Sequence, residues 1–358
     1  MTDDLQALRT DRAAWDAFVE RTPTGAYTQL SPWADVKGGN GWRPIRVVAA
    51  GADGPIGMQL LVRDLRPTPW RFGYAPRGPV AATFDAVGVA GLTRELRLVA
   101  RRERLVDVLV DPEVEEGDPL AGLLEAHGWR PAASVQTARS RILDLDRSEE
   151  QLWGDLRKKW RQYISKARRD GVTIEDVGAG GLDDFYRIYV DTARRAGFIY
   201  RAKRTYDEVF EAYVRTDRAR LLVARLADGT PAATLMLLRC GRRVIEPYGG
   251  MTEAGADSRA NYLLKWEAIR SSRERGAAVY DMWGLSHAGI EHFKAGFGGR
   301  EVTYIGGRAL TIDRAGAASA RVAQRVRVMM ARRRHGIGHQ AGQPVGQRGD
   351  GTAAGDAT

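Results

Sequence analysis

The stretch Tyr280–Ile312, YDMWGLSHAGIEHFKAGFGGREVTYIGGRALTI, decides how the rest of the chain is interpreted. Its residues predict a strand over 277–282, a turn, a short helical segment that ends in glycines, and a second strand over 301–305. Glycine adopts backbone conformations that other residues avoid, so a glycine-rich stretch allows sharp reversals of the chain. The pattern places one lysine, Lys294, between glycine turns at the mouth of a sheet.

Lys294 is flanked by two aromatic residues, Phe293 and Phe297. Aromatic neighbours lower the local dielectric constant, so a single ammonium group there can act strongly on a carbonyl oxygen of a substrate. The alternative is that both phenylalanines belong to the core and that the lysine is solvated. His287 and His292 flank the lysine and are candidate general bases.

Composition indicates a globular protein without a disulfide framework. The chain has 358 residues, of which 44% are apolar and 28% charged, and this length favours two domains. A single cysteine, Cys240, excludes an internal disulfide and a CxxC metal site, and the five histidines are scattered. The first residues lack the apolar region of a signal peptide, and no run approaches the roughly 18 apolar residues of a membrane span. We expect a soluble, cytoplasmic protein that needs neither metal nor cofactor.

The net charge of +10 is concentrated in two clusters. Seven lysines and arginines lie within residues 157–169, and eight arginines follow residue 313 against two aspartates. Basic clusters attract polyanions such as nucleic acid, nucleotide-linked substrates or an anionic membrane surface. Composition does not choose among these three.

Two similar α/β units follow one another along the chain. The clearest echo is a turn, Ala52-Asp53-Gly54 in the first unit and Ala227-Asp228-Gly229 in the second. Each turn joins two apolar runs, and a helix follows. The expected strands and helices span residues 45–50, 56–62 and 87–103 in the first unit and residues 221–226, 232–239 and 260–275 in the second. We predict an α/β (α+β) fold of two tandem domains, 1–147 and 148–313, each a mainly antiparallel mixed sheet flanked by helices.

A helix is expected between the two units. Ser148 and Gln151 form a capping box, which predicts the start of one helix that continues to Gly171. Its apolar residues share one face and the first basic cluster the other, which favours either a solvated surface or contact with a polyanion. Beyond the second unit we expect a basic helix over 314–335, able to pack on the first domain, and a disordered tail over 336–358.

Common catalytic signatures are absent from the sequence. It contains no GxGxxG, GxxxxGK[ST], HExxH or GxSxG motif. A doubled α/β unit is also compatible with a GNAT-type acyltransferase that uses acyl-CoA. Residues 251–259, which stand where such enzymes bind pyrophosphate, lack the expected spacing, and this counts against CoA.

Eight short motifs lie in order between about residues 14 and 313. They are Gln29–Lys37, Tyr74–Val80, Asp111–Val114, Arg169–Val172, Gly197–Arg201, Tyr248–Gly250, Tyr280–Asp281, and Phe293–Lys294 with Phe297. In this order they resemble the FemABX family of tRNA-dependent peptidyltransferases, most of all its compact FemX-like members.

The resemblance implies both a fold and an activity. The family has two GNAT-like domains and moves an amino acid from aminoacyl-tRNA onto the stem-peptide amine of a peptidoglycan precursor, either lipid II or UDP-MurNAc-pentapeptide. Such a protein would work in cell-wall biogenesis as a cytoplasmic monomer, without cofactor, with peripheral contact to the inner membrane face. Replacement of an ester by an amide is downhill, so the chemistry needs mainly positioning and a cation near the carbonyl.

The resemblance also assigns residues to roles. Phe293 and Lys294 match the family's functional pair, in which the ammonium lies near the reacting aminoacyl ester. Lys37 and Arg201 match the two cations that grip the phosphates of the precursor. A second set matches substrate-binding positions: Asp111 and Tyr248 near the peptide channel, and Tyr206, whose match is offset by a length difference.

The chain also departs from the family pattern. It lacks the coiled-coil arm of the longer FemA and FemB proteins, and it adds an arginine-rich tail that would be free to touch tRNA or an acidic membrane face. Three other functions stay open: aminoacylation of a peptide natural product, CoA-dependent acyl transfer, and nucleic-acid binding without catalysis.

Overall fold

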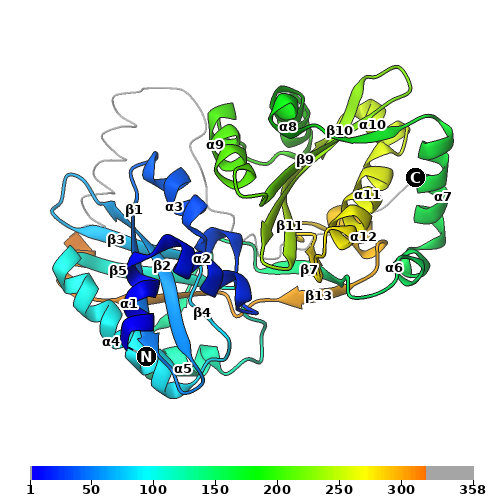
Figure 1. Ribbon diagram of the computed structural model, residues 1–358. Coiled ribbons are helices and arrows are strands. Elements are labelled where there is room, and N and C mark those ends of the chain that lie inside the picture. The colour runs from blue at the N-terminus through cyan, green and yellow to red at the C-terminus, as the bar shows by residue number, and fades with distance from the viewer. Residues whose placement is uncertain (1, 320–358) are drawn as a thin grey trace, which may run out of the picture.

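The computed structural model describes residues 2–319 of the chain. Two seven-stranded sheets fill two halves of the molecule, which lie side by side (Figure 1). The N-terminal sheet has the order β1-β2-β3-β5-β14-β6, with β4 paired to β2. Its strands are β1 (Arg43–Ala50), β2 (Pro55–Asp64), β3 (Arg71–Arg77), β4 (Val80–Ala81), β5 (Leu105–Pro112), β6 (Arg130–Ala132) and β14 (Gly307–Thr311).

The C-terminal sheet has the order β13-β7-β12-β11-β10-β9-β8. Its strands are β7 (Arg139–Asp144), β8 (Thr173–Asp176), β9 (Ala219–Arg225), β10 (Pro231–Cys240), β11 (Arg243–Met251), β12 (Val279–Asp281) and β13 (Arg300–Thr303). One pair in each sheet is parallel, β3 with β5 and β11 with β12, and the other pairs are antiparallel. The predicted class of two α/β units with mainly antiparallel mixed sheets is confirmed.

The two sheets exchange strands. β7 precedes the predicted boundary at residues 147 and 148, yet it pairs with β12 and β13 in the C-terminal sheet. β14 falls within the predicted second domain, 148–313, yet it lies between β5 and β6 in the N-terminal sheet. The sheets therefore do not divide the chain at one point, and the chain crosses between the halves more than once.

Helices cover both sheets. In the N-terminal half they are α1 (Thr2–Thr10), α2 (Arg12–Arg21), α3 (Ser31–Gly38), α4 (Ala86–Glu103) and α5 (Leu120–Ala126). In the C-terminal half they are α6 (Glu149–Asp155), α7 (Lys158–Arg169), α8 (Leu182–Ala196), α9 (Lys203–Val214), α10 (Glu253–Asp257), α11 (Ala260–Glu274) and α12 (Ala288–Ala295). The short 3-10 segments are Tyr27–Gln29 and Gly178–Gly181. No helix within residues 2–319 combines the length and the apolar character that a bilayer crossing requires.

The helix expected to run from Ser148 to Gly171 is broken. The capping box is present, because the Ser148 hydroxyl and the Gln151 side chain each accept the other residue's backbone N–H. The chain then leaves helical geometry between α6 and α7, and the backbone N–H of Arg157 donates to the carbonyl of Gly296 at 2.9 Å. The prediction of one continuous helix was therefore wrong. The sequence pattern did not reveal the break, because the apolar residues on both sides of it stay buried on one face: Leu152, Leu156, Trp160, Ile164 and Ala167.

Three large apolar clusters form the core. One packs α4 and α5 on the N-terminal sheet, and a second packs α7 and α11 on the C-terminal sheet. The third joins the halves, because α2 and α3 pack there against α8 and α9. Its aromatic residues are Trp15, Phe18, Tyr27, Trp33, Phe185, Tyr189, Tyr206, Phe210 and Tyr213.

The segment after β14 turns back on the N-terminal half. Residues 314–319 are helical, and Ala317 packs against Val106 of β5. The rest of the basic helix expected over 314–335, and the tail expected over 336–358, lie outside the described residues.

A buried ionic cluster also connects the halves. Arg243 on β11 pairs with Asp281 on β12 and, at 2.9 Å, with Glu113, which follows β5 in the other half. The hydroxyl of Tyr304 lies 3.2 Å from both Arg243 and Glu113. The two carboxylates are almost fully buried, so each depends on the guanidinium for compensation.

Arg243→Met is therefore expected to lower the free energy of unfolding by about 3–5 kcal/mol, because it leaves two buried carboxylates unpaired. Urea unfolding followed by tryptophan fluorescence measures the loss. Arg242→Met is the matched control, since Arg242 pairs with Asp146 on an exposed surface and is worth less than about 1 kcal/mol. Equal effects of the two substitutions would contradict a special role for the buried cluster.

Candidate functional site

Lys294 is held by an unusual turn. It lies in the last turn of α12, and its ammonium donates to the carbonyls of Trp283 and, at 2.8 Å, of Gly284. Trp283 has a φ of 53°, a left-handed conformation that is uncommon for a bulky residue. Asp281 fixes this turn, because its carboxylate accepts the backbone N–H of Trp283 at 2.7 Å. Two successive carbonyls therefore meet one ammonium.

Burial lowers the pKa of Lys294 to about 8. Desolvation of the ammonium is the main cause; the negative charge of Glu246 opposes it and the positive charge of Lys265 adds to it. Glu246 and Lys265 form a buried ion pair, and the Tyr280 hydroxyl donates to Glu246 at 2.6 Å. Lys294 is thus half-buried beside a neutralised pair, and the alternative of a freely solvated lysine is wrong.

Phe293 connects Lys294 to its surroundings. Its ring centroid lies 5.1 Å from that of Tyr262 and 5.3 Å from that of Phe297. The backbone carbonyl of Phe293 accepts the indole N–H of Trp160 on α7 at 3.0 Å. Phe297 is 1% exposed and belongs to the core, in agreement with the alternative that both phenylalanines are core residues. Phe293, by contrast, is only partly buried.

The two histidines near Lys294 have other contacts. His287 caps α12, since its ring nitrogen accepts the backbone N–H of Ile290. The ring of His292 lies 3.2 Å from the guanidinium of Arg157. The structure gives neither ring a contact with Lys294 among the described residues.

A second group brings cations from both halves together. Lys37 lies in the last turn of α3, with its ammonium 4.4 Å from the ring centroid of Trp33. Its pKa is lowered to about 8, mainly by burial and also by the positive charge of Arg201. Arg201 follows α8 and is exposed. Within residues 2–319 neither cation forms an ion pair with a carboxylate, so both charges are available to an anion.

Two predicted tyrosines belong to this second group. The hydroxyl of Tyr206 accepts the backbone N–H of Arg201 at 3.0 Å, and its ring lies 5.2 Å from that of Tyr248. Burial raises the pKa of Tyr248 to about 12, so its hydroxyl stays protonated and can donate a hydrogen bond. Although a length difference offsets the sequence match of Tyr206 to the family, the structure places its hydroxyl beside the backbone of Arg201.

Asp111 lies in a third group, on β5. It is 2% exposed, and one carboxylate oxygen accepts the Tyr74 hydroxyl at 2.8 Å and the backbone N–H of Val135 at 3.1 Å. The other oxygen, Oδ1, is buried without a hydrogen-bond partner among the described residues. A buried carboxylate oxygen of this kind is costly unless a ligand donates to it.

Aromatic residues link the lysines of the first two groups. The Trp283 ring lies 6.5 Å from that of Tyr27, and Tyr27 lies 5.5 Å from Trp33, which contacts Lys37. The guanidinium of Arg77 sits 5.0 Å from the Trp283 ring. Sequence reasoning did not single out these linking residues, although Trp33, Arg77 and Trp283 lie inside quoted stretches.

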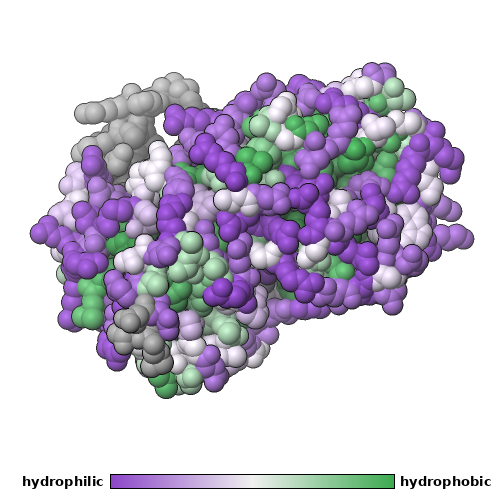
Figure 2. Space-filling model, in the orientation of Figure 1, coloured by the Kyte–Doolittle hydropathy of each residue, from purple (hydrophilic) through white to green (hydrophobic). Residues whose placement is uncertain are grey.

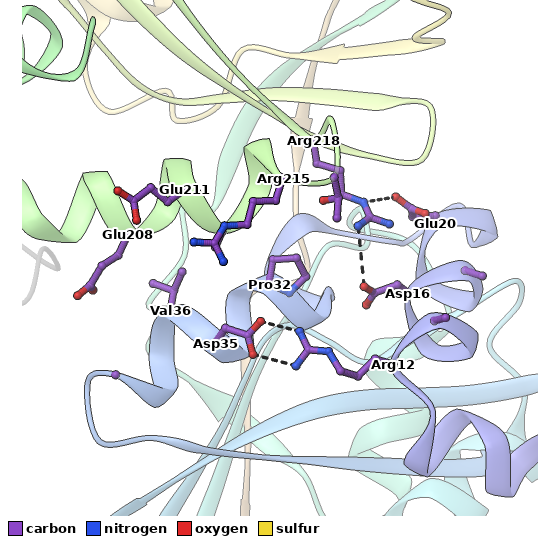
Figure 3. A pocket seen from close by; sticks show the side chains of 15 residues that line it. Arg12, Asp16, Glu20, Pro32, Asp35, Val36, Glu208, Glu211, Arg215 and Arg218 are labelled. Carbon is purple, nitrogen blue, oxygen red and sulfur yellow. Dashed lines mark hydrogen bonds and ion pairs between the residues drawn. The ribbon is translucent and has the colours of Figure 1, made fainter. Parts of the chain in front are cut away.

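An open groove between helices of the two halves is a separate feature. It has a volume of about 750 Å³ and lies between α2, α3 and α9. Figure 3 shows Arg12 paired with Asp35 across its lower rim, and Arg218 between Asp16 and Glu20. None of the seven predicted site residues lines it. The described residues also contain no cluster of side chains that would hold a metal ion.

Comparisons with known proteins agree with this fold. The FemAB family model matches residues 10–118, and an acetyltransferase (GNAT) domain model matches residues 154–295. The lipid II:glycine glycyltransferases of Staphylococcus haemolyticus (strain JCSC1435) and Staphylococcus aureus (strain MRSA252) are 27% and 26% identical over 234 residues, which is 62% of this chain. The chain spans 56% and 55% of these relatives.

Solved structures complete the comparison. The crystal structure of FemX superposes with a TM-score of 0.77 at 20% identity, over 85% of this chain and 96% of that one. The chain is therefore similar to the FemAB family over residues 10–118 and shares its fold with FemX. The structure of L-PGS from Bacillus licheniformis has a TM-score of 0.53 at 14% identity, over 89% of this chain and 97% of that one. At these identities the structural likeness concerns the fold, which is a pair of GNAT-like units.

The electrostatic effect of Arg201 on Lys37 can be tested by titration. Arg201→Gln is expected to raise the pKa of Lys37 from about 8, because it removes a positive charge, while burial keeps the value below 10.5. NMR of protein labelled at lysine Cε follows the titration of each ammonium. Lys203 is the internal control, since its hydrogen bond to Asp207 raises its pKa. An unchanged pKa of Lys37 in the variant would show that Arg201 does not influence this ammonium.

Proposed function

We propose that this protein is a member of the FemABX family, an aminoacyltransferase that moves an amino acid from aminoacyl-tRNA to the stem-peptide amine of a peptidoglycan precursor. The observation that carries the proposal is the Lys294 ammonium, half-buried and held by two backbone carbonyls without a carboxylate in direct contact. The name of the curated relatives, lipid II:glycine glycyltransferase, supports a lipid-linked precursor as the acceptor.

The reaction exchanges an ester for an amide. The acceptor amine attacks the ester carbonyl carbon, a C–N bond forms, and the bond to the ribose oxygen breaks. The proton lost by the amine balances the one gained by the ribose hydroxyl. Lys294 donates toward the oxygen on which charge develops, and a donor fixed in a desolvated site is effective because it needs no reorganisation during the reaction.

The cations of the second group bind the precursor. Lys37 and Arg201 hold its phosphates, because two cations whose charges act on each other, and which pair with no carboxylate within residues 2–319, favour a phosphate group between them. Tyr206 orients the backbone of Arg201, and Tyr248 supplies a protonated hydroxyl beside them. Since Lys37 and Arg201 come from different halves, the anion also bridges the halves.

The stem peptide connects the phosphate end to Lys294. Asp111 has one buried oxygen without a donor, which suits an amide or ammonium group of the peptide. Tyr27 and Trp283 provide apolar ring surface between the two lysines. In this arrangement Phe293 holds α12 against α7 and so sets the position of Lys294.

A CoA-dependent acyl transfer is the second candidate, favoured by the match of residues 154–295 to an acetyltransferase domain. Aminoacylation of another peptide is a variant of the first. Transfer assays with each charged tRNA, and separately with acetyl-CoA, against lipid II, UDP-MurNAc-pentapeptide and unrelated peptides distinguish the three. Turnover with acetyl-CoA and none with charged tRNA would overturn the proposal.

Lys294→Met is expected to lower kcat about 10²–10³-fold while the KM for precursor changes little, because the ammonium acts on charge that develops in the transition state. Arg201→Ala is expected to raise the KM for precursor by about tenfold with a smaller effect on kcat. Steady-state transfer of radiolabelled amino acid measures both constants. Arg204→Ala is the control, since Arg204 pairs with Glu208 on the surface. Parent-like turnover by Lys294→Met would remove this lysine from the mechanism.

The pH dependence of kcat gives an independent test. Lys294 is protonated below its pKa of about 8, so its contribution is present at neutral pH and is lost as the pH rises through about 8. Deprotonation of the acceptor amine acts in the opposite direction. Lys294→Arg separates the two, because an arginine stays charged and should give a slower enzyme without the alkaline decline. The same alkaline decline in parent and variant would assign it to another group.

A further inference from the structure

The first turn of α7 carries cations that the fold does not use. Lys158 and Lys159 are exposed, and within residues 2–319 neither pairs with a carboxylate. Further along the same helix Lys166 pairs with Asp170, and Arg168 pairs with Glu267. The positive end of a helix dipole disfavours lysine in the first turn, and this turn of α7 contains no acidic residue. The uncompensated charge therefore costs stability where it stands, which points to a partner.

This cationic end is joined directly to the helix that carries Lys294. The backbone N–H of Arg157 donates to Gly296 at 2.9 Å, and the indole of Trp160 donates to the carbonyl of Phe293 at 3.0 Å. The Arg157 guanidinium also contacts the ring of His292. In Figure 1, α7 and α12 lie in the same part of the C-terminal half, away from α3. A ligand bound here therefore lies beside the helix that carries Lys294.

An aromatic ring lies among these cations. The centroid of the Tyr163 ring is 5.6 Å from the ammonium of Lys159 and 4.9 Å from the guanidinium of Arg259, which comes from the start of α11. Tyr262 contacts the same ring at 4.9 Å. Cations interleaved with partly exposed aromatic rings are typical of surfaces that bind RNA, where phosphates and unpaired bases are both available.

The burial of α7 favours RNA over a membrane. The apolar stripe of this helix, Trp160, Ile164 and Ala167, is buried against the C-terminal sheet and α11. A helix that lies in a bilayer interface needs a free apolar face, and α7 has none. Hydrophilic side chains cover much of the edge of the molecule that carries α7 (Figure 2). The exposed face of α7 therefore offers only separated positive charges, and these suit the phosphate backbone of RNA.

We propose that the first turn of α7, together with Arg157 and Arg259, is the surface that binds the acceptor end of aminoacyl-tRNA; this rests on the proposed function. The surface contacts backbone phosphates without reading base sequence, and it directs the 3′ end across α12 to Lys294. Donor and precursor then reach the ammonium from opposite sides of the Trp283 turn.

Binding of an uncharged RNA hairpin tests the surface without relying on turnover. The probe is a fluorescein-labelled acceptor-stem hairpin with an unpaired CCA end, followed by anisotropy between about 50 and 300 mM KCl. Lys158→Gln/Lys159→Gln is expected to weaken binding about tenfold at about 100 mM KCl and to reduce the slope of log affinity against log salt by about two units. The matched control, Lys166→Gln/Arg168→Gln, removes the same charge from paired positions and should change both quantities much less.

Three results would overturn the proposal. If both double variants weakened hairpin binding equally, net charge alone would account for the binding. If neither variant weakened hairpin binding, α7 would not be part of the RNA-binding surface. Loss of binding to phosphatidylglycerol vesicles with unchanged RNA binding would assign the surface to a membrane. Lys294→Met is expected to bind the hairpin normally, so loss of transfer and loss of docking are measured separately. If no pair of substrates gives transfer, weaker hairpin binding by Lys158→Gln/Lys159→Gln would still show that the first turn of α7 binds RNA.

Discussion

The buried carboxylate of Asp281 is the contact on which the arrangement around Lys294 depends. It is 0% exposed and accepts hydrogen bonds from the Ser140 hydroxyl on β7 and from the backbone N–H of Trp283, and it pairs with Arg243 on β11. The first contact sets β7 against the C-terminal sheet, and the second fixes the turn whose carbonyls receive Lys294. The third holds Arg243, which in turn pairs with Glu113 in the other half. A buried anion must be compensated on every side, so these three partners have little freedom to move.

The same electrostatic constraint explains why Lys294 keeps an available charge. Around α12 the buried ions occur in matched pairs, Lys265 with Glu246 and Arg243 with Asp281. Lys294 instead contacts two carbonyl dipoles, which compensate an ammonium less than a carboxylate would. Desolvation by burial lowers its pKa to about 8. A direct carboxylate partner would have restored the pKa and also neutralised the charge that a substrate needs.

Local features of the fold followed from the sequence, and non-local ones did not. The turns at Gly54 and Gly229 have positive φ, and the Ser148 capping box begins α6, as their residue types predicted. The exchange of β7 and β14 between sheets was not predictable, because each strand pairs with residues far away in the chain and its own pattern says nothing about which sheet receives it. The break between α6 and α7 was missed since it is made by a carbonyl beyond α12.

The candidate site shows the same division. Single positions such as Lys37 and Lys294 were identified through motifs, but the proximity of Lys37 to Arg201 depends on how α3 packs against α9. The linking aromatic residues also needed coordinates, since Tyr27 and Trp283 are 256 positions apart and read as ordinary core residues until their rings are seen in contact. Spacing along a chain carries no information about such pairs.

Trp283 stands at the point where the two proposed substrates meet. Its carbonyl accepts a hydrogen bond from the Lys294 ammonium, while its ring lies near Tyr27 and Arg77, where the proposed precursor would pass. One residue thus fixes both the proton donor and the wall along which the acceptor amine would approach. An uphill reaction would need a covalent intermediate or an energy source, whereas exchange of an ester for an amide needs the amine, the carbonyl carbon and the ammonium in line. A rigid turn between two substrate surfaces supplies that alignment, and this accounts for a conspicuous lysine in a chain that has no nucleophilic triad motif.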